Sequence, residues 1–163
     1  MYVMARFKRR PPLQRVALGA VAGVAGTMLM QAMMMTSGKF LPRSKPPVKK
    51  DPGEFMTEKV PLPEAVRPWA AKSLHLGYGM TSGAIYGALR ARRGSPLSDG
   101  ALLGIGLWAA GYLGWLPATG LMPGVHKQEP QQIAVPIVQH ALFGVAVAAG
   151  YQALWDLCDR WES

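Results

Sequence analysis

Long apolar segments separated by basic and proline-rich stretches dominate the chain. The segment from Val16 to Met35 runs for 20 residues without a charged side chain, and about 20 apolar residues are needed for a helix to cross the hydrocarbon layer of a bilayer. Three further apolar segments follow. The pattern therefore predicts an all-α, polytopic membrane protein with four transmembrane helices.

The predicted boundaries follow the changes in polarity along the chain. Transmembrane helices are expected at residues 16–37, 74–90, 100–117 and 132–157. Between and around them we expect a basic tail at 1–15, a proline-rich basic loop at 38–73, a short basic loop at 91–99, a loop at 118–131 and a C-terminal tail at 158–163. Glu64 to Lys72 is predicted to form a short interfacial helix within the first loop. Pro136 is expected in the first turn of the last helix, where its missing N–H matters least.

One sequence frame occurs twice in the chain. It consists of a histidine, an aromatic residue three positions later, a glycine at the fourth position and a tyrosine at the eleventh. The first copy runs from His75 to Tyr86 and the second from His140 to Tyr151. A Gly-x-x-x-Gly pair also recurs at the start of the first and third apolar segments. The chain is therefore predicted to consist of two repeated helical hairpins.

Helix geometry places the repeated residues on one face. At 100° per residue, a step of eleven returns to within about 20° of the starting face, so each histidine shares a face with its tyrosine. Small residues at four-residue spacing let helix backbones approach closely in lipid, and the stripe is expected to face the bundle interior. The glycines predicted to pack helices are Gly19, Gly23, Gly79, Gly83, Gly87, Gly104 and Gly144.

The histidine–tyrosine stripes are the candidates for chemistry. The candidate ligand or proton-handling residues are His75, His140, Tyr86, Tyr151, His126 and Glu129. The favoured interpretation is structural, with each histidine hydrogen-bonded to a nearby carbonyl or hydroxyl group. Two alternatives stay open. Imidazole and carboxylate groups hold metals or relay protons in small transporters, and two facing histidines serve as axial ligands of haem in electron carriers. No tight ligand spacing and no haem-attachment motif is present, so we predict no metal site and no cofactor.

Motifs of the common enzyme classes are absent from the sequence. It has no nucleophile–base pair, phosphate loop, metal-hydrolase motif or dinucleotide fingerprint, so no enzymatic activity is expected. A single cysteine, Cys158, excludes an internal disulfide. The carboxylates beside that cysteine disfavour a reactive thiolate.

The net charge of +9 is distributed as in membrane proteins rather than nucleic-acid binders. The basic residues fall in tails and loops that flank apolar segments. The expected partner is therefore the bilayer, together with other membrane subunits or a second copy, and no nucleic acid. Four segments place both termini on one side. The dense basic residues of the N-terminal tail and the second loop predict that this side is the cytoplasm.

Several motifs recur in one known family. The glycine-rich first helix is followed directly by Leu-Pro-Arg at residues 41–43, and Leu-Met-Pro-Gly at residues 121–124 precedes the last helix, which carries His140 and continues to Tyr151. In these features the chain resembles the YagU-like family of small bacterial inner-membrane proteins, whose function is unknown. The likeness covers most of the chain outside the first loop, which is longer and more basic here. It implies a multi-pass inner-membrane protein without established enzymatic activity.

The sequence as a whole thus predicts an inner-membrane protein that acts as a non-enzymatic structural or accessory subunit. Such a subunit would pack through its glycine-rich helix faces, either within the chain or against a partner. The alternatives are the small transporter or proton- and metal-handling protein and the haem-binding carrier described above.

Cysteine-accessibility labelling tests the predicted topology. The first loop and Lys127 should lie on one side of the membrane, and both tails and the second loop on the other. Cysteines introduced at Ser44 and Ser95 should therefore be labelled from opposite sides. Labelling of both from the same side would contradict the four-helix arrangement.

Overall fold

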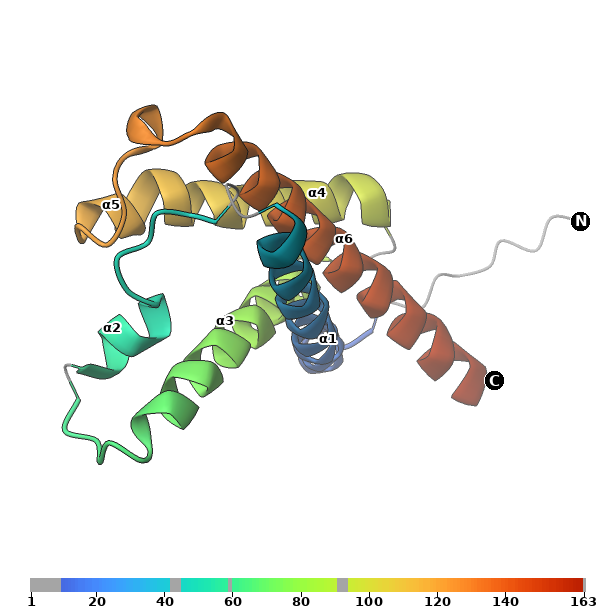
Figure 1. Ribbon diagram of the computed structural model, residues 1–163. Coiled ribbons are helices and arrows are strands. Elements are labelled where there is room, and N and C mark those ends of the chain that lie inside the picture. The colour runs from blue at the N-terminus through green and yellow to red at the C-terminus, as the bar shows by residue number, and fades with distance from the viewer. Residues whose placement is uncertain (1–9, 42–44, 59, 91–93, 163) are drawn as a thin grey trace, which may run out of the picture.

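The structure is a computed structural model that describes residues 10–41, 45–58, 60–90 and 94–162. All regular structure in these ranges is helical (Figure 1). The elements in chain order are α1 (Pro12–Phe40), α2 (Pro52–Glu58), α3 (Arg67–Leu89), α4 (Pro96–Ala109), the π-helical turn η2 (Ala110–Trp115), α5 (Leu116–Ala118), the 3₁₀ turn η3 (Val125–Lys127) and α6 (Pro130–Trp161).

Three helical stretches in the described ranges are long and apolar enough to cross a membrane, judged by length and composition. They are Pro12–Ser37 within α1, Pro96–Ala118 across α4 to α5, and Pro130–Trp161, which is α6. The expected all-helical class is therefore confirmed, with three helices of this composition rather than the four predicted. α3 has 23 residues, but Arg67, Lys72 and other polar residues along it lower its hydropathy.

α1 and α3 cross where glycine backbones meet. Gly19 of α1 lies against Gly83 of α3, and Gly23 lies against Gly79, so the two helices run antiparallel. A methyl group on Gly83 would lie only 2.7 Å from the Cα atom of Gly23. Backbones this close gain dispersion contacts, which hold helices together in lipid because apolar burial provides no drive there.

A second crossing of the same kind joins α4 to α6. Gly100 lies against Gly144, and Gly104 lies against the backbone of His140. A methyl group on Gly144 would lie 2.6 Å from the amide nitrogen of Gly104. α6 also packs on α1, so it lies between α4 and α1 and joins the two crossed pairs (Figure 1).

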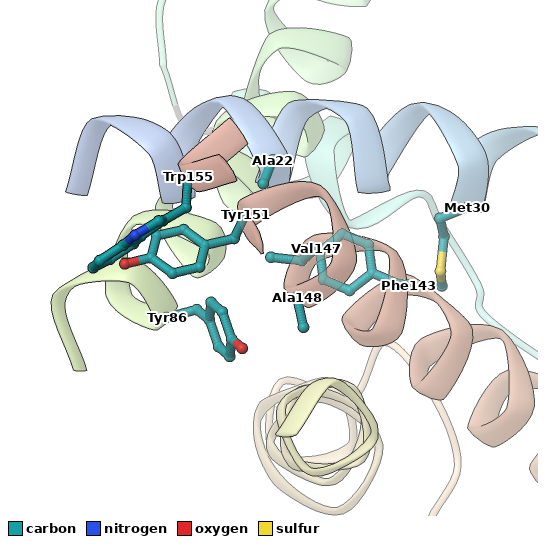
Figure 2. Packing of buried hydrophobic residues seen from close by; sticks show 8 residues of the cluster. All are labelled: Ala22, Met30, Tyr86, Phe143, Val147, Ala148, Tyr151 and Trp155. Atoms are coloured by element: carbon teal, nitrogen blue, oxygen red, sulfur yellow. The ribbon is translucent and has the colours of Figure 1, made fainter. Parts of the chain in front are cut away.

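Larger side chains fill the centre of this arrangement. Figure 2 shows side chains of α6 packed against α1, with Tyr86 of α3 beside Tyr151. Tyr151 and Val147 are almost completely buried. The rings of Tyr86 and Tyr151 meet edge to face, with their centroids 5.5 Å apart. Tyr86, Tyr151 and Trp155 thus form the aromatic end of the core, and Val147 and Phe143 continue it along α6.

The first two long helices extend beyond their predicted ends. α1 continues past Gly38, where the sequence predicts its end, and closes at Leu41, whose N–H donates to the Ser37 carbonyl at 2.7 Å. α3 begins at Arg67 rather than at residue 74 and so includes most of the segment expected to form a separate interfacial helix. The helix inside the first loop is instead α2.

The last helix begins earlier than predicted. Glu129 and Gln132 form a reciprocal capping box that starts α6 at Pro130. Pro136 therefore lies in the second turn, not in the first turn where the sequence analysis placed it. Neighbouring helices allow a proline inside a membrane helix, because they compensate for the backbone group that it leaves free.

The third predicted span is not a regular α-helix throughout. It begins at Pro96, where the Ser95 hydroxyl accepts the N–H of Ser98 at 3.4 Å. Beyond Ala109 it widens into η2, and Gly114 leaves the helical region there, with φ −103° and ψ −106°. Such π-helical turns are rare and occur frequently at functional sites.

Replacing Gly83 by Leu should break the α1–α3 crossing. The new side chain would meet the backbones of Gly19 and Gly23, which cannot move aside as a flexible side chain can. We expect a loss of about 3 kcal/mol of stability or more, measured by thermal unfolding in detergent micelles. Gly106→Leu is the matched control, because a Cβ atom there meets nothing within 4 Å. Equal stability of the two variants would contradict the close crossing.

Candidate functional site

Polar and aromatic side chains gather at the two ends of the helical arrangement. The tail-end network, near both described chain ends, contains Arg10, Tyr86, Arg90, Asp99, Tyr151, Trp155, Asp159 and Glu162. The loop-end cluster contains Trp108, Tyr112 and His140. His140 and Asp159 lie roughly 28 Å apart along α6, at 1.5 Å per residue. The two groups are therefore separate sites.

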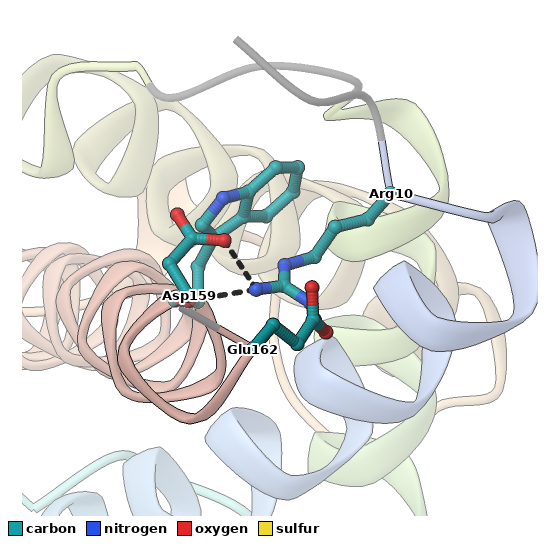
Figure 3. A network of polar contacts seen from close by, with 4 residues as sticks. Arg10, Asp159 and Glu162 are labelled. Carbon is teal, nitrogen blue, oxygen red and sulfur yellow. Dashed lines mark hydrogen bonds and ion pairs between the residues drawn. The ribbon is translucent and has the colours of Figure 1, made fainter.

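Arg10 connects the N-terminal end of α1 to the C-terminal end of α6 (Figure 3). Its Nη1 donates to the Glu162 carboxylate at 2.9 Å, and its Nη2 donates to the Asp159 carboxylate and to the Trp155 carbonyl. The guanidinium also lies 5.3 Å from the centroid of the Trp155 ring. Burial alone would lower the pKa of Arg10, but the hydrogen bond to Glu162 and the charges of Asp159 and Glu162 raise it above its ordinary value.

A second part of the tail-end network connects α3, α4 and α6. Arg90, which caps the C-terminus of α3, forms an ion pair with Asp99 in the first turn of α4. The Tyr151 hydroxyl donates a hydrogen bond to the backbone carbonyl of Arg90 at 3.0 Å. The guanidinium of Arg90 lies 5.9 Å from the centroid of the Tyr86 ring. The amide of Gln152 donates to the carbonyl of Gly94. Tyr86 and Tyr151 are thus engaged in contacts that hold the helix ends together.

The loop-end cluster lies beside the π-helical turn. The rings of Trp108 and Tyr112 stack at 5.6 Å, and Tyr112 meets the His140 ring edge to face at 5.9 Å. The Nδ1 atom of His140 lies 2.8 Å from the Pro136 carbonyl oxygen. Since a carbonyl only accepts, Nδ1 carries the hydrogen, and Nε2 is the acceptor of the neutral ring.

The first loop covers the loop-end cluster. The N–H of Lys49 donates to the Leu121 carbonyl at 2.9 Å, and the amide of Gln132 donates to the Lys45 carbonyl at 3.3 Å. Val48 and Phe55 pack against the cluster's apolar surroundings. The proline-rich loop is therefore folded onto the helices and is not an extended linker in its described part.

The structure separates the residues of the predicted histidine–tyrosine stripes. Tyr86 and Tyr151 are buried and touch each other, and His140 is half-buried. His75 is exposed, so the expectation that it faces the interior is wrong. α3 diverges from α1 and packs against α2 along this part of its length (Figure 1).

The remaining candidates also lie apart. His126 in η3 and Glu129 at the start of α6 are both exposed, and Glu129 serves as a helix cap. Among the residues that the structure describes, no three His, Cys, Asp or Glu side chains lie within reach of one metal ion. The exposed position of His75 also removes one of the two enclosed ligands that the haem alternative requires.

The Arg10 connection was not predicted from the sequence. The sequence pattern places Arg10 among the basic residues of the N-terminal tail, where it counts only towards membrane orientation. Its partners Asp159 and Glu162 lie about 150 positions later. The sequence offers one signal for this pairing: the N-terminal tail is basic, and the C-terminal end carries Asp159 and Glu162. That signal predicts a contact only if both ends of the chain are known to lie on the same side.

Comparisons with protein-family models, with curated proteins and with solved structures find no match to this chain. The function of the chain is therefore inferred from the geometry of its described helices. The two glycine crossings, the tail-end network and the surface of α3 provide that geometry.

Replacing Arg10 by Met should weaken the connection between the two ends of the chain. Methionine keeps an apolar stem against Trp155 but loses the hydrogen bonds to Asp159 and Glu162, so we expect a loss of about 1–2 kcal/mol. Thermal unfolding of Arg10→Met, Asp159→Asn and the double variant gives the coupling energy of the pair. Purely additive losses would show that Arg10 and Asp159 do not interact.

Proposed function

We propose that this chain is a bacterial inner-membrane protein that crosses the membrane four times and acts as a non-enzymatic structural or accessory subunit. The three apolar helices support membrane insertion. α3 is roughly 35 Å long at 1.5 Å per residue, which suffices for a fourth crossing. The two antiparallel glycine crossings support an arrangement of two helical hairpins, α1 with α3 and α4 with α6.

The contact between α1 and α3 supports α3 as the fourth span. Gly19 and Gly23 lie inside the 20-residue uncharged run of α1, so any bilayer around α1 surrounds them. Their partners Gly83 and Gly79 lie at the same depth. A helix packed at this depth is inside the hydrocarbon even though its own composition is less apolar.

The surface of α3 is the observation that carries the subunit proposal. Ser73, His75, Tyr78 and Thr81 are all exposed on it. The imidazole of His75 and the phenol of Tyr78 would have no hydrogen-bond partner if they faced hydrocarbon, which costs several kcal/mol. A neighbouring membrane subunit that supplies hydrogen-bonding groups to α3 removes this cost. α3 is thus the helix through which this chain recognises a partner.

The transporter and haem alternatives are less well supported. Both require His75 and His140 inside the bundle, but His75 is exposed. The two tyrosines that would line a proton path pack against each other and against Arg90. These contacts favour the structural proposal over both alternatives.

We also propose that both termini face the cytoplasm. Arg10 contacts Asp159 and Glu162, so the described ends of the chain lie together. Arg90 and Asp99, which flank the second loop, lie at the same end. The basic residues of the tail at 1–15 and the loop at 91–99 then accumulate on one side, as expected for a cytoplasmic face. Membership of the YagU-like family remains a proposal that depends on the sequence motifs.

Affinity purification of the tagged, full-length chain from native membranes tests the subunit proposal. A second membrane protein should co-purify in mild detergent. Gly77→Leu should reduce its recovery several-fold, because Gly77 lies on α3 between Ser73 and Thr81 and a Cβ atom there meets nothing within 4 Å. The fold should therefore tolerate the change while the docking surface does not.

Gly106→Leu on α4 is the matched control, since its surroundings are equally open. Its recovery of the second protein should equal that of the wild type. Purification of the wild type without any partner, or equal recovery by the Gly77 and Gly106 variants, would show that α3 faces lipid. A Soret band in the absorption spectrum would instead favour the haem alternative.

A further inference from the structure

The guanidinium of Arg15 has no carboxylate partner among the residues that the structure describes. It lies in the first turn of α1, directly before the 20-residue uncharged run. Its Nε atom is buried and has no hydrogen-bond acceptor. No hydrogen bond or ion pair joins its side chain to another residue in the part of the chain that the structure describes. Its two Nη atoms also have no acceptor in this part of the chain, but they are not enclosed, so they are the donors that a group outside the chain can reach.

The other arginines of the tail-end network do have carboxylate partners. Arg10 pairs with Asp159 and Glu162, and Arg90 pairs with Asp99. Three carboxylates at this end, Asp99, Asp159 and Glu162, are therefore engaged with Arg90 and Arg10. The positive charge of Arg15 is thus available to a ligand from outside.

Helix packing determines the depth of Arg15. Its carbonyl oxygen lies against Gly87 at the end of the α1–α3 crossing, and its side chain is half-buried. An arginine at the boundary of an apolar run lies with its stem along apolar surface and its guanidinium at the level of the lipid headgroups. A membrane lipid therefore reaches this guanidinium more readily than a dissolved ion.

We infer that Arg15 binds the phosphate of an anionic phospholipid in the leaflet at the tail end, an inference that depends on the proposed membrane insertion. The planar guanidinium presents paired N–H groups that match phosphate oxygens. The anionic lipids of the cytoplasmic leaflet attract basic residues next to membrane helices. Arg6, Lys8 and Arg9, which precede it in the sequence, add positive charge to the same segment.

Thermal unfolding of the full-length protein in neutral detergent tests this inference. Phosphatidylglycerol, phosphatidylcholine and inorganic phosphate are added separately as probes. Phosphatidylglycerol should raise the unfolding temperature, and the other two should not. Arg15→Gln should weaken the apparent affinity for phosphatidylglycerol about five-fold, the effect of roughly one basic residue at an anionic surface. Arg15→Lys should retain part of the affinity.

Lys127→Gln at the opposite end is the matched control and should leave the affinity unchanged. An equal loss in the Arg15 and Lys127 variants would show unspecific charge attraction and overturn the inference, as would an unchanged affinity in Arg15→Gln. Equal stabilisation by inorganic phosphate would show a site for a free anion and also overturn it. Release of the chain from membranes by alkaline carbonate would instead overturn the proposed membrane insertion.

Discussion

Close contact between glycine backbones is the interaction on which the other features depend. In lipid, an apolar side chain gains nothing by moving from the bilayer into the protein, so dense packing and polar bonds must hold the helices together. The α1–α3 and α4–α6 crossings both use glycine where a methyl group would collide with the opposite backbone. With each pair fixed at this distance, α6 can pack on α1 through larger side chains such as Val147 and Tyr151.

The tail-end network follows from this packing. Antiparallel pairs bring the N-terminus of α1 and the C-terminus of α3 to the same end as the N-terminus of α4 and the C-terminus of α6. Arg10 and Arg90 then lie near carboxylates from other helices, and charged groups that are far apart in sequence become partners. These pairs join the two hairpins at the helix ends, and in the described part of the chain the Arg15 guanidinium is left for a ligand from outside.

The sequence predicts the kind of helix contact better than its register. Four-residue spacing of small residues is visible in a single chain, and Gly19 and Gly83 lie where that spacing puts them. The repeat, however, aligns Gly144 with Gly79. In the structure Gly144 lies between Gly100 and Gly104 of α4, in the same way that Gly83 lies between Gly19 and Gly23 of α1. The predicted and observed registers therefore differ by four residues, about one helical turn. A shift of one turn brings nearly the same helix face into contact, so the hydropathy pattern does not distinguish the two registers. The same lack of long-range information explains why the exposure of His75 and the partners of Arg10 were missed.

The polarity of α3 follows from its place at the edge of the arrangement. α6 contacts both α1 and α4 and has little contact with α3, so polar groups on α6 can find partners on other helices, as Gln139 does with the Ser37 hydroxyl of α1. α3 packs on α1 through one glycine face, and groups such as Tyr78 on its other faces can be satisfied only from outside. The three most apolar helices thus build the centre of the arrangement, and α3 lies at its edge. The least apolar one is left with unmet hydrogen bonds, which in lipid favour a specific neighbour over random contact with the bilayer.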